Sequence, residues 1–120
     1  MKIAFSTSGE SLEAPLDSRF GRAPYFLIYD LDSRQARVVD NGASRASSQG
    51  AGIQAADSVV RAGAGAVVTA HCGPKAFQVL HAAGIKVFSC HAATVGEALD
   101  MYRSGALVEQ TGADVAGHHA

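Results

Sequence analysis

The sequence predicts a three-layer α/β fold, in which about five strands form a mixed sheet with helices on both faces. Two apolar runs, at 66–70 and 85–89, have the composition of strands that are buried on both sides. An amphipathic helical pattern at 74–83 separates them, and such a strand–helix–strand unit has parallel strands and a right-handed crossover. An aromatic and β-branched run at 25–30, followed after a polar turn by 37–39, predicts an antiparallel hairpin.

Local patterns predict the remaining elements. A short apolar run at 3–6 is expected to be a central strand. Helical spacing of apolar residues from position 49 predicts a helix that stops at Gly63. A capping box, Thr94 to Glu97, predicts a third helix that closes at Gly105. The apolar positions of the helix before Gly63 are Ile53, Ala56, Val59 and Val60.

Composition limits the class of protein. The 120 residues are 48% hydrophobic and 18% charged, which is typical of one globular domain; we expect it at 1–108, with a flexible polar tail at 109–120. A net charge of −1 gives no general attraction to nucleic acid or an acidic membrane, and no apolar run reaches the roughly 20 residues that span a bilayer. Two cysteines without a visible export signal predict reduced thiols and a cytoplasmic location.

Thiols and imidazoles follow the two parallel strands. His71 and Cys72 come after the strand at 66–70, and Cys90 and His91 after the strand at 85–89. Carboxyl ends of neighbouring parallel strands lie at one edge of a sheet, roughly 4.8 Å apart, so these four residues are candidate metal ligands. Thiolate and imidazole suit copper(I), zinc, iron–sulfur species and, by the same softness, molybdenum–sulfur clusters. Metal binding has two alternatives. The cysteines can be buried packing residues, or, ranked third, they can form a disulfide with each other.

Helix starts at the same edge favour an anionic ligand. Gly73, Thr94 and the turn at 47–50 each precede a predicted helix, and helix N-termini present unpaired N–H groups with positive partial charge. Arg19, Arg22 and Lys75 would add full charges if the long loop at 13–24 folds over this edge. The sequence therefore predicts a local anion site without any protein-wide positive charge.

Motifs along almost the whole chain resemble the dinitrogenase iron–molybdenum cofactor biosynthesis family. They are the first strand with Ser6 and Thr7, RFGRAPYF at 19–26, GAGIQAA at 50–56, GPKAF at 73–77, AGIKV at 83–87 and TVGEAL at 94–99. The resemblance implies a ribonuclease-H-like fold without nuclease carboxylates, and a protein that carries a molybdenum–copper sulfide cluster or an iron–molybdenum cofactor precursor. It adds the following residues to the expected cofactor site: Ser6, Thr7, Phe20, Gly21, Gly50 and Gly52.

One position departs from the family pattern. Many members have a histidine before the Phe-Gly of the first long motif, and this chain has Arg19 there. Arginine is a cation with hydrogen-bond donors and no lone pair, so this position favours charge pairing with an anionic cluster over coordination.

We expect a binding protein without catalytic residues, and two alternatives remain. One is an interaction module that docks on iron–sulfur or cofactor-assembly proteins. The other is an enzyme that uses a Cys72 thiolate, whose pKa a helix start would lower. Catalysis by paired carboxylates is disfavoured, because the first strand ends in Ser6-Thr7-Ser8 where a two-metal nuclease needs aspartate.

Overall fold

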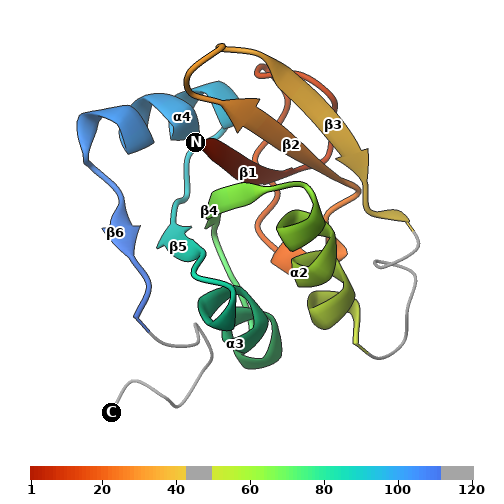
Figure 1. Cartoon of the computed structure of the whole chain (residues 1–120). Helices are drawn as coiled ribbons and strands as arrows, with labels where there is room; N and C mark the ends of the chain where they lie inside the picture. Colours follow the sequence, from red (N-terminus) through yellow and green to blue (C-terminus); the bar gives the residue numbers. More distant parts are fainter. Residues whose placement is uncertain (43–49, 112–120) are drawn as a thin grey trace.

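A computed structural model describes residues 1–42 and 50–111 of the chain (Figure 1). The elements in order are β1 (Lys2–Thr7), the 3₁₀ turn η1 (Phe20–Arg22), β2 (Tyr25–Asp30), β3 (Ala36–Asp40), α2 (Ala51–Arg61), β4 (Ala64–Thr69), α3 (Pro74–Ala82), β5 (Lys86–Ser89), α4 (Val95–Ser104) and β6 (Val108–Glu109). None of the helices in these ranges has both the length and the apolar character that a membrane span requires.

One mixed sheet organises the described residues, in the strand order β3-β2-β1-β4-β5-β6. The predicted hairpin is confirmed, because β2 pairs antiparallel with both β1 and β3. The predicted parallel unit is also confirmed: β4 lies between β1 and β5 and is parallel to both. The fold is therefore mixed α/β with an antiparallel half and a parallel half.

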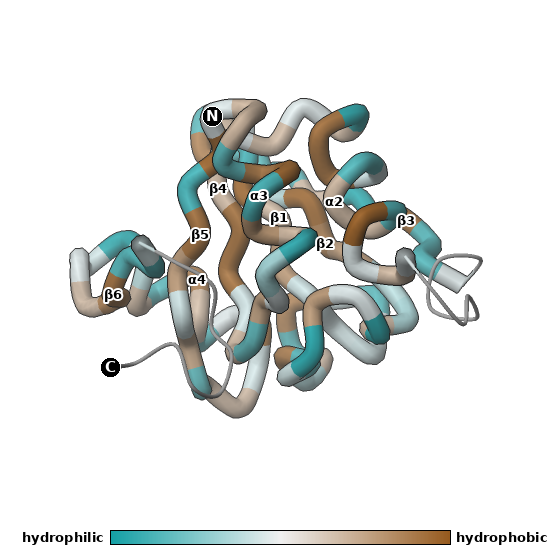
Figure 2. Tube along the Cα trace, turned by 90° about the horizontal axis from the view of Figure 1, so that it is seen from below, coloured by the Kyte–Doolittle hydropathy of each residue, from teal (hydrophilic) through white to brown (hydrophobic). Residues whose placement is uncertain are grey.

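Helices cover both faces of the sheet, as expected. On one face, α2 and α3 pack on alternate strand residues such as Ala4 and Val67. On the other face, α4 packs on the intervening residues, such as Phe5 and Val68. This division follows from the period of two in a strand, and the apolar residues gather along the central strands (Figure 2).

The sheet has six strands where the sequence predicts about five. The additional strand, β6, pairs antiparallel with β5, and the N–H of Gln110 donates to the carbonyl of Val87 at 2.7 Å. Glu109 and Gln110, assigned from the sequence to a tail, are thus hydrogen-bonded to the sheet, while 112–120 lie outside the described residues. The sequence does not predict this strand, because its two residues are exposed and too few to show hydrophobic alternation. Backbone hydrogen bonds, which no side-chain pattern reveals, hold it to β5.

The inner face of α2 differs from the prediction. Ala56 and Val59 are buried as expected, but Ile53 and Val60 are 42% and 37% exposed. Ala51 and Ala55 are buried in their place. Helical spacing identified the helix, but its buried face consists of three alanines and Val59, while the larger Ile53 lies outside.

Candidate functional site

The carboxyl ends of the three parallel strands meet at one edge of the sheet, which we call the rim. Thr7 at the end of β1 pairs with Tyr25, and Thr69 at the end of β4 pairs with Ser89 at the end of β5. Tyr25 also pairs with Asp40 at the end of β3. The loop after β1 runs along this edge, because it bridges to Thr7 at Leu16, to Thr94 before α4 at Pro15 and to His71 before α3 at Arg19. Within the same loop, η1 meets the start of α2, where Gly21 lies against Gly52.

Ser6 and Thr7 hold the long loop against the sheet. Both residues are fully buried. The Ser6 hydroxyl lies 2.8 Å from the carbonyl oxygen of Asp17 and 2.8 Å from the hydroxyl oxygen of Thr69. The Thr7 hydroxyl donates to the carbonyl of Pro15 at 2.7 Å. These two predicted site residues therefore position the loop from beneath and are not exposed to a ligand.

The loop continues along the end of β4 in a short parallel pairing between Arg19 and His71. The His71 N–H donates to the carbonyl of Ser18 at 2.9 Å, and the Phe20 N–H donates to the carbonyl of His71 at 3.0 Å. Phe20 is buried and its ring lies 5.0 Å from that of Phe26. The segment between the two arginines is thus fixed by backbone hydrogen bonds and one aromatic anchor.

Asn41 holds the other end of this segment and was missed from the sequence. Its side chain is 1% exposed, and its Nδ2 donates to the carbonyl of Ala23 at 2.8 Å and to that of Gly21 at 3.4 Å. Its backbone N–H donates to the carbonyl of Pro24 at 2.9 Å. A polar residue after a strand has the composition of an ordinary turn, so only the tertiary contact identifies it.

A pocket of about 340 Å³ opens at the rim between η1 and the starts of α2 and α3. Six of the predicted site residues line it: Phe20, Gly21, Gly50, Gly52, Gly73 and Lys75. Ile53, Pro74 and Ala76 complete the lining. Lys75 is the one charged residue among these nine, and the remaining lining is apolar or glycine. Arg19 and Arg22, which flank the η1 part of the wall, are exposed.

Glycines give this pocket its shape and its hydrogen-bond donors. A Cβ on Gly21 would lie 3.0 Å from the Cα and the N of Gly52, so η1 and α2 approach at backbone distance. Gly50, in the left-handed region with φ +74°, and Gly73 are the N-cap residues of α2 and α3. Glycine has no side chain that can cap a helix, and no described residue accepts from the N–H groups of Gly52 and Ile53 or of Lys75 and Ala76. Within residues 1–42 and 50–111, these donors are therefore unoccupied at the pocket wall.

The start of α4 is closed by contrast. Thr94 Oγ1 accepts from the N–H of Glu97 at 3.1 Å, which confirms the threonine half of the predicted capping box. Glu97 Oε1 accepts from the N–H of Ala93 at 2.9 Å, one residue before the expected N–H of Thr94. The N–H groups of Val95 and Gly96 donate to carbonyls of the 12–14 loop. Because the N–H groups in the first turn of α4 are occupied, the predicted site residue Thr94 does not stand at a helix start that is open to an anion.

The four candidate metal ligands divide into two kinds of position. The rings of His71 and His91 are exposed, and their centroids lie 5.7 Å apart. The prediction that residues following the two strands lie close together is therefore confirmed for the histidines. Cys72 is fully buried in the core under α2 and α3, whereas Cys90 is 2% exposed in the core under α4. The thiols therefore lie on opposite faces of the sheet and form no disulfide. Within residues 1–42 and 50–111, no group of three or more His, Cys, Asp or Glu side chains could hold a metal ion.

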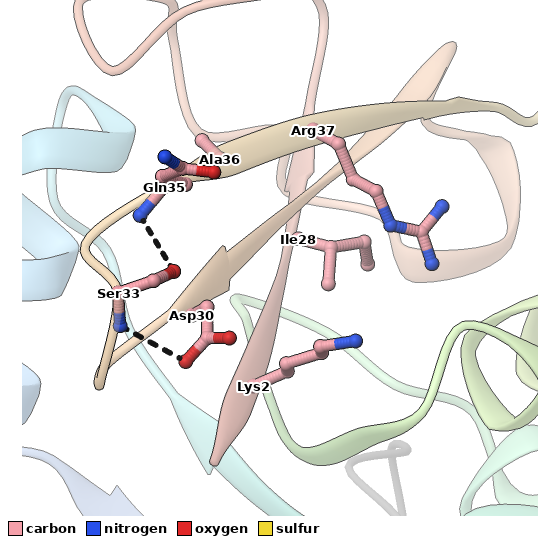
Figure 3. Close-up of a pocket in the computed structure, with 7 residues that line it drawn as sticks. All are labelled: Lys2, Ile28, Asp30, Ser33, Gln35, Ala36 and Arg37. Atoms are coloured by element: carbon pink, nitrogen blue, oxygen red, sulfur yellow. Dashed lines mark hydrogen bonds between the residues drawn. The ribbon is translucent and has the colours of Figure 1, made fainter.

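A second pocket, of about 210 Å³, lies at the opposite end of the sheet (Figure 3). Lys2, Arg37 and Asp30 line it, so it mixes charges of both signs. The N–H of Asp32 donates to Asp30 Oδ1 at 2.9 Å and holds the pKa of that carboxyl below its usual range, which keeps it ionised. This pocket thus places a carboxylate beside two cations, whereas the lining of the rim pocket has one cation, Lys75, and no carboxylate.

Comparisons with known proteins show the family of the chain and its structural relatives. A sequence model of the family described as dinitrogenase iron-molybdenum cofactor matches residues 1–105. The apo form of the orange protein from Desulfovibrio gigas is 43% identical over 92% of this chain and 93% of its own, with a TM-score of 0.90. A candidate NifB protein from Thermotoga is 35% identical over 97% and 98%, with a TM-score of 0.85. An uncharacterized protein of Methanocaldococcus jannaschii is 26% identical over 89% of both chains.

Replacing Gly21 by alanine tests the close approach of η1 to α2. Because the new Cβ would meet backbone atoms of Gly52 at 3.0 Å and Ala51 C at 3.3 Å, the helix start must move. We expect the free energy of unfolding in urea to fall by about 1–3 kcal/mol. The control is Gly73→Ala, whose Cβ would meet no atom within 4 Å and whose φ is −69°, with an expected change below about 1 kcal/mol. Equal effects of the two variants would contradict the close approach.

Replacing Thr94 by alanine tests its role as a cap. Loss of the bond to the N–H of Glu97 should lower the free energy of unfolding by about 1 kcal/mol. The matched control is Ser104→Ala at the exposed end of the same helix, where a change below about 0.5 kcal/mol is expected. A Thr94 variant as stable as the Ser104 variant would show that the cap contributes nothing.

Alkylation measures the burial of the thiols. Since Cys72 and Cys90 are 0% and 2% exposed, iodoacetamide should modify both slowly in the native protein and rapidly in urea, as followed by mass spectrometry. Native labelling at the rate of the unfolded chain would mean that the thiols are accessible.

Proposed function

Because the chain belongs to the dinitrogenase iron–molybdenum cofactor family, we propose that it is a non-catalytic carrier that binds an anionic metal–sulfur cluster in the rim pocket. The observation that carries the proposal is this pocket: residues from three family motifs, far apart in the sequence, line one cavity of about 340 Å³. The cluster is cargo, which the protein would accept and release. The family supports a cofactor carrier in general, and the pocket supports the particular surface.

The lining suits a large, weakly hydrated anion. Hard oxyanions lose strong hydration when they enter an apolar pocket, whereas a sulfide-rich cluster spreads its charge over soft sulfur atoms. Backbone N–H groups of Ile53 and Ala76, with the positive ends of α2 and α3, would supply hydrogen bonds and partial charge. Lys75 adds a full charge in the wall, and Arg19 and Arg22 add charge next to it. Affinity for an anion would then arise locally, in a chain whose net charge is −1.

Two finer statements belong to the proposal. The cargo would be a molybdenum–copper sulfide cluster or an iron–molybdenum cofactor precursor, because soft sulfide ligands and an imidazole-bearing rim suit copper and molybdenum alike.

The fold would be ribonuclease-H-like, which the strand order of an antiparallel β3-β2-β1 half and a parallel β1-β4-β5 half supports.

The cellular setting stays a prediction. We expect a cytoplasmic protein whose other partners are cofactor-assembly or iron–sulfur proteins, and the exposed arginines beside the pocket are the surface on which such a partner would dock. A thiolate enzyme is disfavoured by the burial of Cys72, since a nucleophile must reach its substrate.

Reconstitution tests the carrier proposal. Apo-protein is incubated anaerobically with tetrathiomolybdate and copper(I) and desalted, and retained molybdenum and copper are measured together with charge-transfer absorption. We expect retention by the wild-type chain and a roughly three- to tenfold weaker affinity for Lys75→Gln, because one charge in the wall is lost.

Two further variants make the result specific to the pocket. Lys86→Gln removes an exposed lysine on β5 that does not line the pocket and should bind as the wild type does. Gly73→Leu adds a side chain where a Cβ meets open space, and it should abolish retention while the chain stays folded. No retained colour in the wild type, or equal losses for the two lysine variants, would refute binding in this pocket.

A further inference from the structure

Two exposed histidines lie at the rim outside the lining of the pocket. His71 follows β4 and His91 follows β5, and their rings meet edge to face with centroids 5.7 Å apart and planes inclined by 71°. Neither residue lines the rim pocket. His71 is two residues before Gly73 of the pocket wall, so their Cα atoms lie within about 7.6 Å of each other.

This separation falls in the range of two imidazoles that share a metal ion. A transition-metal ion lies about 2.0–2.1 Å from an imidazole nitrogen, which puts two coordinating rings roughly 4.5–6.3 Å apart between centroids for ligand angles from 90° to 180°. The observed 5.7 Å falls inside that interval. Binding would require each exposed ring to turn one nitrogen toward a common ion.

The backbone beneath both rings is fixed, which lowers the entropic cost of binding. The N–H and the carbonyl of His71 are both hydrogen-bonded to the 18–20 segment. Next to His91, the N–H of Cys90 donates to the carbonyl of Thr69 at 3.1 Å, and the N–H of Ala92 donates to Cys90 Sγ at 3.5 Å. The last contact also gives the Cys90 sulfur a structural role in the turn. The cysteines are thus accounted for by packing, and the imidazoles alone are presented to solvent.

We propose that His71 and His91 form a two-histidine site for a copper or zinc ion, and that neither cysteine is a ligand. Imidazole nitrogen suits both metals, and two protein ligands leave positions on the ion for water or for sulfur atoms of the cargo. Such a site is open on one side, so an ion can enter and leave it, as transfer requires. Its role beside the cluster rests on the proposed function, but its existence does not.

Titration with copper(II) alone tests the site without any thiomolybdate, so failure here is distinguishable from failure of cluster binding. All proteins carry His118→Ala and His119→Ala, because the terminal histidine pair would bind copper as well. Affinity is measured by competition with a chromophoric chelator, and the number of coordinated nitrogens by electron paramagnetic resonance. We expect His71→Ala and His91→Ala each to weaken binding at least tenfold and to remove one nitrogen from the spectrum.

The controls separate this site from other histidines and from the thiols. His81→Ala removes an exposed ring that stacks on Phe77 and should leave affinity and spectrum unchanged. Cys72→Ser and Cys90→Ser should also bind as the parent does. His71→Gln and His91→Gln repeat the test with side chains of closer size, should an alanine variant unfold. Unchanged binding in the His71 and His91 variants, an equal loss in His81→Ala, or a loss in either serine variant would overturn the assignment.

Discussion

Parallel pairing of β4 with its neighbours β1 and β5 is the constraint on which the site depends. It brings the carboxyl ends of three strands to one rim, and every chemically relevant segment leaves the sheet there. Because the crossovers follow these ends, the starts of α2 and α3 open beside each other on one face. The loop after β1 is then held at the same rim by Ser6, Thr7 and the backbone of His71. Each of these hydrogen bonds is weak by itself, but together they fix the position of the 19–22 segment at the rim.

The three helix starts at the rim differ in what occupies their first-turn N–H groups. A threonine cap and the 12–14 loop close α4, whereas glycine caps leave α2 and α3 open towards the pocket. This difference decides which helix termini can act on an anion, since a dipole whose donors are already paired has little left to offer a ligand. Glycine at 21 and 52 has a second effect, because it allows η1 and α2 to approach closely enough to form a common wall.

Burial separates the soft ligands from the imidazoles. Thr69 and Ser89 end β4 and β5 in register, and Cys90 continues the alternation of β5 on the face of Phe88. Cys72 does not continue the alternation of β4, because the chain turns after Thr69 and places it in the opposite half of the core. His71 and His91, next to them in the sequence, remain at the surface. In the two proposals above, the rim would hold an anion in its pocket and, beside it, a metal cation between two imidazoles. A carrier of a mixed-metal sulfide cluster would have use for both.

The sequence by itself determined the α/β class, the parallel unit and the hairpin, and it predicted a candidate site at the carboxyl ends of the parallel strands. These follow from local hydrophobic periodicity and from chain connectivity, which act over ten to thirty residues. It also predicted six of the residues that line the pocket: Gly73 and Lys75 through the helix starts at the sheet edge, and the other four through the family resemblance. Only the tertiary structure decided that α2 packs through alanines with Ile53 outside, that Asn41 holds the loop, that β6 joins the sheet, and that the cysteines are buried while the histidines meet. The physical reason is that these outcomes depend on distances between segments remote in the chain, and neither residue type nor spacing specifies which face of the sheet such a side chain reaches.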